Sequence, residues 1–176
     1  MKTSLSREGY SQAGPTAPTV MVSCVDSVGK ANIITLGMYM PISHDPPQVV
    51  IGVSPKRYSH DLIMEQGEFV VNSPGIGIVE KMHICGIKSG RDTDKWTEAG
   101  LKPIPAQKVR PPLIEECYGH IECEVVNMVT CGDHTLFVGE VVAASIDTDC
   151  LKNGKLDLGK AKPIAQKNWD YHTLSM

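Results

Sequence analysis

The sequence has few aromatic residues and no long apolar run. Its 176 residues include two Phe and two Trp, so aliphatic, Met and Cys side chains must fill most of the core. No stretch reaches the roughly 18–20 consecutive apolar residues of a membrane-spanning helix. Residues 1–14 lack the apolar centre of a signal peptide. We therefore expect a cytoplasmic protein without a membrane partner.

The chain also lacks a basic excess and any Cys-x-x-Cys pair. Its formal net charge is −3, which gives no electrostatic basis for binding nucleic acid. Its six cysteines show neither the thioredoxin nor the zinc-ribbon spacing, and in the cytoplasm they would be reduced thiols. The lone Gly75-x-Gly77 lacks the third glycine and the preceding strand of a dinucleotide-binding fingerprint.

What is present is typical of one ordinary globular domain, with 41% hydrophobic and 21% charged residues. The length is sufficient for a core that needs no disulfide or metal. We expect a single domain over residues 1–176. Residues 1–17 would form an N-terminal arm and residues 165–176 a C-terminal tail. A contact with a partner subunit is one expected use of Trp169 and Tyr171 in this tail.

Short apolar segments separated by turn residues predict strands over residues 19–25, 33–40, 48–53, 68–72, 119–129 and 135–145. In the strand 119–129, alternation places Ile121, Cys123 and Val125 inward, with Glu122 and Glu124 outward. Short helices are expected over residues 59–66, from about residue 76, and over residues 93–99. Ser59 would be the N-cap of the first helix and Gly67 its C-terminal stop. This pattern predicts a mainly β barrel with a few short α-helices.

An anion site is predicted where the strand 48–53 leads into the first helix. The N-terminus of a helix has unpaired N–H groups and the positive end of the helix dipole. Lys56 and Arg57 add two cations there, and Ser54 and Ser59 add hydroxyl groups. The alternative is that Lys56 and Arg57 are solvated surface residues.

Several motifs in a fixed order carry a resemblance to a known family. They are Asn32-x-x-Thr35, Ser43-x-x-Pro46-Pro47, Ser54-Pro55-Lys56-Arg57-x-Ser59, Glu68–Asn72, Ser89–Lys95, Gly132-Asp133-His134 and Gly139–Val141. Across about residues 17–145, the chain resembles the flavin reductase-like family of FMN-binding split barrels, which includes flavoredoxins and the reductase components of two-component monooxygenases. The resemblance implies a split β-barrel of Greek-key type and a homodimer with the flavin at its interface.

The resemblance also implies the cofactor and its contacts. FMN is expected, with FAD as the alternative. The residues implied in cofactor binding are Asn32, Ile34, Thr35, Leu36, Gly37, Ser54, Pro55, Lys56, Arg57, Ser59, Ser89, Arg91 and Lys95. His134 would lie near the flavin, where a cation or hydrogen-bond donor stabilises the negative charge of the reduced ring and makes the site sensitive to pH.

Electron transfer through the flavin is the expected function, with no side chain acting as nucleophile. The donor is NAD(P)H if the protein is a flavin reductase, or a redox protein if it is a flavoredoxin. A non-catalytic FMN-binding or ligand-sensing barrel is the alternative from another class. We expect no metal, although Cys117, Cys123, Cys131 and His134 offer ligands for zinc or iron. The adjacent Ser43, His44 and Asp45 point in different directions, which disfavours a hydrolase triad.

Overall fold

The computed structural model describes residues 2–173. Seven strands form the main sheet: β2 (Val20–Val25), β3 (Ala31–Leu36), β4 (Tyr39–His44), β5 (Pro47–Val53), β6 (Glu68–Ser73), β9 (Gly119–Cys131) and β10 (His134–Ile146). The helices are α1 (Tyr58–Gln66), α2 (Val79–Ile87), α3 (Lys95–Ala99) and α4 (Leu158–Ala161), with short 3-10 turns η1 (Tyr10–Ala13), η2 (Ile76–Ile78) and η3 (Thr148–Cys150).

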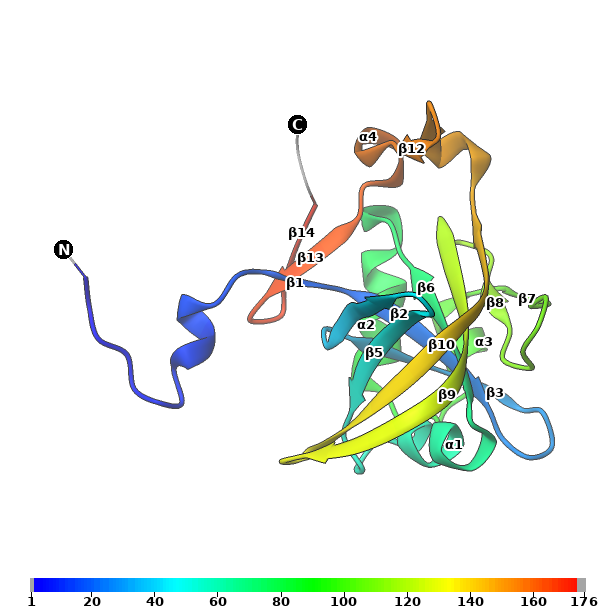
Figure 1. Ribbon diagram of the computed structural model, residues 1–176, viewed down its shortest axis with the longest axis horizontal. Helices are drawn as coiled ribbons and strands as arrows, with labels where there is room; N and C mark the ends of the chain where they lie inside the picture. The colour runs from blue at the N-terminus through cyan, green and yellow to red at the C-terminus, as the bar shows by residue number, and fades with distance from the viewer. Residues whose placement is uncertain (1, 174–176) are drawn as a thin grey trace.

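Three small sheets complete the secondary structure. The first joins β1 (Ala17–Pro18) to the hairpin of β13 (Ile164–Lys167) and β14 (Asp170–Thr173). The second pairs β7 (Pro103–Ile104) with β8 (Leu113–Ile114), and the third pairs β11 (Leu151–Lys152) with β12 (Lys155–Leu156). Figure 1 shows the N-terminal arm extending away from the barrel beside the β13–β14 hairpin.

The main sheet closes on itself because of one short connection. Its strand order is β3-β2-β6-β9-β10-β5-β4, so β3 and β4 are the two edges. Only Gly37 and Met38 separate these edges in the chain, and such a link spans at most about 11 Å. The sheet must therefore curl until its edges approach each other. This confirms the predicted mainly β split barrel, and the long β9–β10 hairpin crosses its front in Figure 1.

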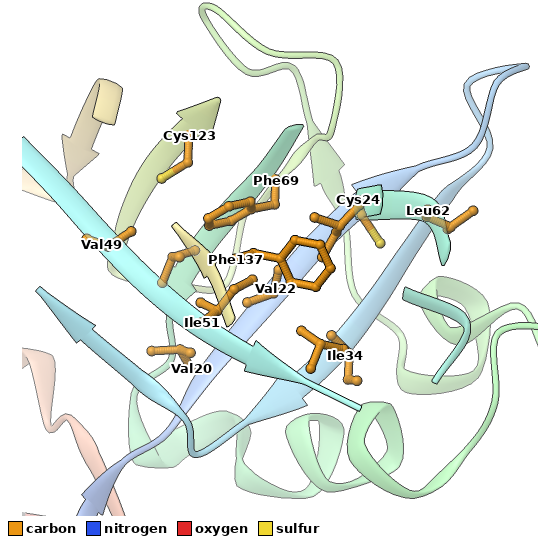
Figure 2. Packing of buried hydrophobic residues seen from close by; sticks show 13 residues of the cluster. Val20, Val22, Cys24, Ile34, Val49, Ile51, Leu62, Phe69, Cys123 and Phe137 are labelled. Atoms are coloured by element: carbon orange, nitrogen blue, oxygen red, sulfur yellow. The ribbon is translucent and has the colours of Figure 1, made fainter. Parts of the chain in front are cut away.

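The barrel interior is filled mainly by aliphatic and sulfur-containing side chains around two aromatic rings. Phe69 and Phe137, the only phenylalanines of the chain, are both fully buried. Figure 2 shows them packed among residues of β2, β3 and β5, such as Val22, Ile34 and Ile51. Two phenylalanine rings are thus sufficient for the barrel core, because both lie at its centre.

A second cluster lies on the other face of β2 and β3. Met21 and Ile33 alternate with the barrel-facing residues of the same strands, as the two-residue period of a strand requires. They pack against Met82 and Cys85 of α2 and Trp96 of α3. This packing fixes α2 and α3 against β3. Within residues 2–173, no helix combines the length and apolar character needed to cross a membrane.

The expected outward position of Glu122 is wrong in one respect. The side chain of Glu122 does lie on the other face of β9 from that of Cys123, but it is fully buried because the segment 105–112 covers it. Its carboxylate accepts backbone N–H groups from Gln107 and Lys108 at 2.7–3.1 Å. The segment 105–112 is therefore held on the barrel by a buried carboxylate.

Candidate functional site

Two adjoining cavities lie where β3, α1 and the end of α2 meet. The larger has a volume of about 710 Å³, within the usual range of ligand pockets. It is lined by Ala17, Ile34, Thr35, Leu36, Gly37, Met38, Gly52, Ser54, Lys56, Arg57, Gly86, Asp133, His134, Gln166, Trp169 and Tyr171. The smaller is lined by Asn32, Ile34, Lys56, Arg57, Tyr58, Ser59, Gly86, Lys88, Ser89, Gly90 and Lys95.

The small cavity has a strongly positive wall. Four cations, Lys56, Arg57, Lys88 and Lys95, are among the described residues that line it, and none of these lining residues is a carboxylate. The first turn of α1 opens onto the same cavity through Tyr58 and Ser59. The charge and the helix N-terminus together make this cavity suited to an anion.

Lys95 is the most unusual of these cations because it is buried, with 5% of its surface exposed. Its Nζ donates to the carbonyl oxygens of Ile33 at 2.7 Å and Cys85 at 2.9 Å. Burial lowers the pKa of the Lys95 amine, and the nearby Arg57 lowers it further. The ammonium has three N–H donors, so after these two bonds one donor is available to a ligand.

Ser59 has a different position from the one predicted. The N-cap of α1 is Arg57, without a side-chain capping bond, and Ser59 lies inside the first turn, buried. Its Oγ accepts a 2.8 Å hydrogen bond from Nδ2 of Asn32. This bond joins β3 to α1, and the Ser59 hydroxyl also lies within hydrogen-bonding reach of the buried Cys24 thiol. Gly67 ends the helix in the left-handed conformation, as predicted.

The segment 88–94 covers one side of the small cavity. Gly90 lies so close to Asn32 that an added Cβ would be 2.1 Å from its Oδ1. Arg91 pairs with Asp61 at 2.6 Å and lies over the ring of Tyr58, 5.3 Å from its centroid. Arg91 therefore holds the segment against α1 and does not itself line either cavity.

One wall of the larger cavity is the end of β3. Oγ1 of Thr35 donates to the carbonyl oxygen of Met82 at 2.6 Å, which ties β3 to α2. Gly37 faces Gln166 of β13, and a Cβ at Gly37 would meet Nε2 of Gln166 at 1.8 Å. A Cβ at Gly37 would displace the amide end of the Gln166 side chain, so the glycine lets this amide lie beside the strand.

His134 lies at another edge of the larger cavity, at the start of β10. Its Nδ1 is 2.8 Å from Oδ1 of Asp133, and this hydrogen bond holds the pKa of the Asp133 carboxyl below its usual range. His134 is partly buried and Asp133 is exposed. The imidazole is thus oriented by a carboxylate and available to a ligand.

The cysteines that offered a metal site are not brought together. Cys123 lies in the barrel core and Cys117 in the second cluster, whereas Cys131 is exposed. Across residues 2–173, no three His, Cys, Asp or Glu side chains are grouped as metal ligands. Burial raises the pKa of the Cys123 thiol to about 12, so it is an unreactive core residue.

The structure thus brings the predicted residues to the two cavities, apart from Pro55 and Arg91. Sequence reasoning missed the following lining residues: Ala17, Met38, Gly52, Tyr58, Gly86, Lys88, Gln166, Trp169 and Tyr171. Tyr58 and Lys88 adjoin predicted motifs and could have been found by that proximity. The residues of β1, β13 and β14 had no such signal.

Comparison with known proteins identifies the family. The flavin reductase like domain matches residues 14–172. A protein of Archaeoglobus fulgidus is 38% identical over 134 residues, which are 76% of this chain and 75% of that protein. Flavoredoxin of Desulfovibrio vulgaris (Miyazaki F) superposes with a TM-score of 0.91 at 26% identity, covering 100% of this chain and 94% of that one. An FMN-binding protein of Thermus thermophilus superposes with a TM-score of 0.82 at 26% identity, covering 98% and 94%. The chain belongs to the flavin reductase-like family.

Proposed function

We propose that the protein binds FMN across the two cavities and transfers electrons through it. The observation that carries this proposal is the small cavity, which combines four cations, a helix N-terminus and no carboxylate among its described lining residues. A terminal phosphate fits this chemistry. The similarity to flavoredoxin and to an FMN-binding protein supports a flavin cofactor as the molecule that carries this phosphate. FAD remains the alternative cofactor.

The residues around the cavities would divide the work of binding. Lys95, Arg57 and the Ser59 hydroxyl would hold the phosphate. The flat ring would lie along β3 from Ile34 to Gly37, where all four residues line the larger cavity. Ser54, Lys56 and Ser89 would contact the chain between phosphate and ring. Pro55 and Arg91 would act indirectly, since Arg91 closes the segment 88–94 on α1.

His134 would tune the bound cofactor. When bound, the flavin supplies the redox chemistry and becomes more negative on reduction. A hydrogen bond or positive charge from His134 at the cavity edge would favour the reduced form. Asp133 keeps the imidazole oriented.

We further propose that the protein is a homodimer. Met38, Met40 and Ile42, on or just before the edge strand β4, are 52%, 57% and 42% exposed. Met38 also lines the larger cavity, so the exposed apolar surface is continuous with the ligand site. Exposed apolar surface of this kind is typical of an interface. A second copy of the chain is the occupant that the family resemblance implies.

A spectroscopic titration tests the proposed function. The purified protein, supplied with FMN, should show bound flavin in its visible spectrum. Anaerobic addition of NADH and then NADPH distinguishes the two versions of the proposal. Bleaching of the flavin bands by a nicotinamide indicates an NAD(P)H-dependent reductase. Bands that persist until dithionite is added indicate a carrier supplied by a redox protein. A flavin that is bound but not redox-active in turnover with any donor would support the sensing barrel, and a protein that binds no FMN would contradict the proposal.

A further inference from the structure

The small cavity is a short extension of the larger one. Its volume is about 60 Å³, less than a tenth of the 710 Å³ of its neighbour. The two cavities share Ile34, Lys56, Arg57 and Gly86 as lining residues, so one ligand can occupy both. At the roughly 10–15 Å³ that a water molecule needs, the small cavity admits about four to six heavy atoms, the size of one phosphate group. Its remaining walls therefore decide whether a longer ligand can continue past that group.

One of these walls is the connection between α2 and α3, residues 88–94. Its residues 88–90 line the small cavity and not the larger one. Gly90 lies tightly against the elements that it faces, because an added Cβ would be 2.1 Å from Oδ1 of Asn32 and 3.0 Å from Cδ1 of Tyr58. At Gly90 the connection therefore leaves no passage between itself and either β3 or α1.

Arg91 fastens this connection to α1 and to the turn before it. Its Nη2 donates to Oδ2 of Asp61 at 2.6 Å, and its Nη1 donates to the carbonyl oxygen of Lys56 at 3.4 Å. In the part of the chain that the structure describes, these are the two hydrogen bonds that join the connection to that region. The guanidinium also lies over the ring of Tyr58, 5.3 Å from its centroid. Because Arg91 lines neither cavity, all of these contacts are made from outside the ligand site.

The contacts of Arg91 are weak enough to open. The side chains of Arg91 and Asp61 are 45% and 55% exposed, and an exposed ion pair changes an equilibrium by at most about fivefold. The contact with the aromatic ring adds a factor of about two to five. The connection also has hydrogen bonds of its own, because the backbone N–H groups of Asp92 and Thr93 donate to the carbonyl oxygen of Ser89 at 3.2 and 3.1 Å. It can therefore move away from α1 as one unit.

We propose that Arg91 restricts the site to a flavin with a single terminal phosphate, because it holds the connection 88–94 closed over that phosphate without touching it. This inference rests on the proposed function and selects FMN over FAD. FAD continues beyond the same phosphate with a second phosphate and an adenosine, so its binding needs the open connection. The affinity for FAD is then reduced by the fraction of molecules that are open, whereas FMN binds the closed form. Arg91 is thus a positioning residue that determines cofactor specificity.

Calorimetric titration of the flavin-free protein with FMN and with FAD tests this assignment. The wild type should bind FMN at least about threefold more tightly than FAD. Arg91→Met should tighten FAD binding by about threefold to thirtyfold and change FMN affinity by less than about threefold. Asp61→Asn should also tighten FAD binding, by a smaller factor, because the contact of Arg91 with the aromatic ring remains. Arg110→Met is the matched control, since Arg110 is 49% exposed, pairs with Glu68 at 3.2 Å and lines neither cavity.

The Asp61→Asn variant separates this indirect role from direct contact with the phosphate. If Arg91 bound the phosphate itself, Arg91→Met would weaken FMN binding at least about tenfold, and Asp61→Asn would not tighten FAD binding. That pattern overturns the assignment and leaves the proposed function intact. The same holds for a wild type that binds FAD as tightly as FMN or more tightly, and for an Arg91→Met protein with the wild-type ratio of affinities. A wild type that binds neither flavin overturns both. Circular dichroism should show that all variants are folded, because exposed ion pairs contribute little to stability.

Discussion

Replacing Lys95 with Met tests the phosphate site most directly. The substitution keeps an unbranched side chain and removes the cation that is buried beside the small cavity. A hydrogen bond to a charged partner contributes about 1.5–3 kcal/mol, which corresponds to roughly 10-fold to 150-fold weaker FMN binding. The matched control is Lys56→Met. Lys56 is exposed, so its loss should cost no more than about 1 kcal/mol, or about fivefold.

The fold must be checked in the same experiment, because Lys95 also has a structural role. The variant removes a donor from the carbonyl groups of Ile33 and Cys85, and each lost partner costs about 1–3 kcal/mol of stability. Circular dichroism at low temperature should establish that the variant is folded. FMN affinity is then measured by titration of flavin fluorescence under the same conditions.

The pH dependence of binding gives an independent signature of Lys95. Burial lowers the pKa of the amine below its ordinary value of 10.5 in the ligand-free protein, and a bound phosphate should raise it again. Between these two values FMN binding takes up a proton, so affinity should fall as pH rises. In the ligand-free protein the unfolded chain binds more protons over the range from the lowered pKa to 10.5, so the free energy of unfolding should rise with pH there.

These expectations are refuted by a single result. A folded Lys95→Met protein that binds FMN within threefold of the wild type, with the same fall in affinity at alkaline pH, would show that the phosphate does not contact this amine. Calorimetry in buffers with different ionisation enthalpies measures the proton uptake directly. The uptake should be absent from the variant and present in the Lys56→Met control.

Four further predictions follow from the same geometry. Gly90→Ala should weaken FMN binding at least tenfold, because its Cβ would push the Asn32 amide away from Ser59. Gly77→Ala is the control and should bind FMN normally, because the space around its Cβ is open. Equal FMN affinities of the two variants would contradict the role of Asn32. His134→Ala should lower the flavin reduction potential, because a hydrogen-bond donor to the reduced ring is lost, and a spectroelectrochemical titration that finds no change would remove His134 from the redox site. Met40→Glu should convert the proposed dimer into a monomer in light scattering, with the solvent-exposed Val28→Glu as control; a dimer that persists would exclude β4 from the interface. Glu122→Gln should lower the free energy of unfolding by about 1.5–3 kcal/mol, because the buried carboxylate that accepts the N–H groups of Gln107 and Lys108 is replaced by an amide, while FMN affinity stays the same in titrations of the folded protein.

The part of the site that the sequence predicts best is local in the chain. The strand β5, the turn at Lys56 and Arg57, and the helix α1 follow one another, so turn and helix signals are enough to place them. The alternation in β9 likewise predicts which residues face the barrel core. Local patterns cannot show what covers the opposite face, and for this reason the burial of Glu122 under the segment 105–112 was not predicted.

The wall of the larger cavity that β1 and the β13–β14 hairpin form depends on contacts between the two ends of the chain. Ala17 pairs with Gln166, and nothing in the composition of either segment specifies that partner. The aromatic residues Trp169 and Tyr171 were noticed in the tail, yet their position beside β3 follows only from this pairing. The described part of the tail, up to Thr173, lies against its own chain, and residues 174–176 are outside the described range.

The two cavities differ in how deeply their lining residues are buried, and this difference determines which residues can be replaced without loss of stability. Asn32, Ser59 and Lys95 of the small cavity are buried and bonded to neighbouring elements, so substitutions there disturb both ligand binding and stability. Met38 and Trp169 of the larger cavity are exposed, and exposed side chains can be replaced at little cost to folding. We therefore expect substitutions in the larger cavity to be tolerated by the fold more readily than substitutions in the small cavity.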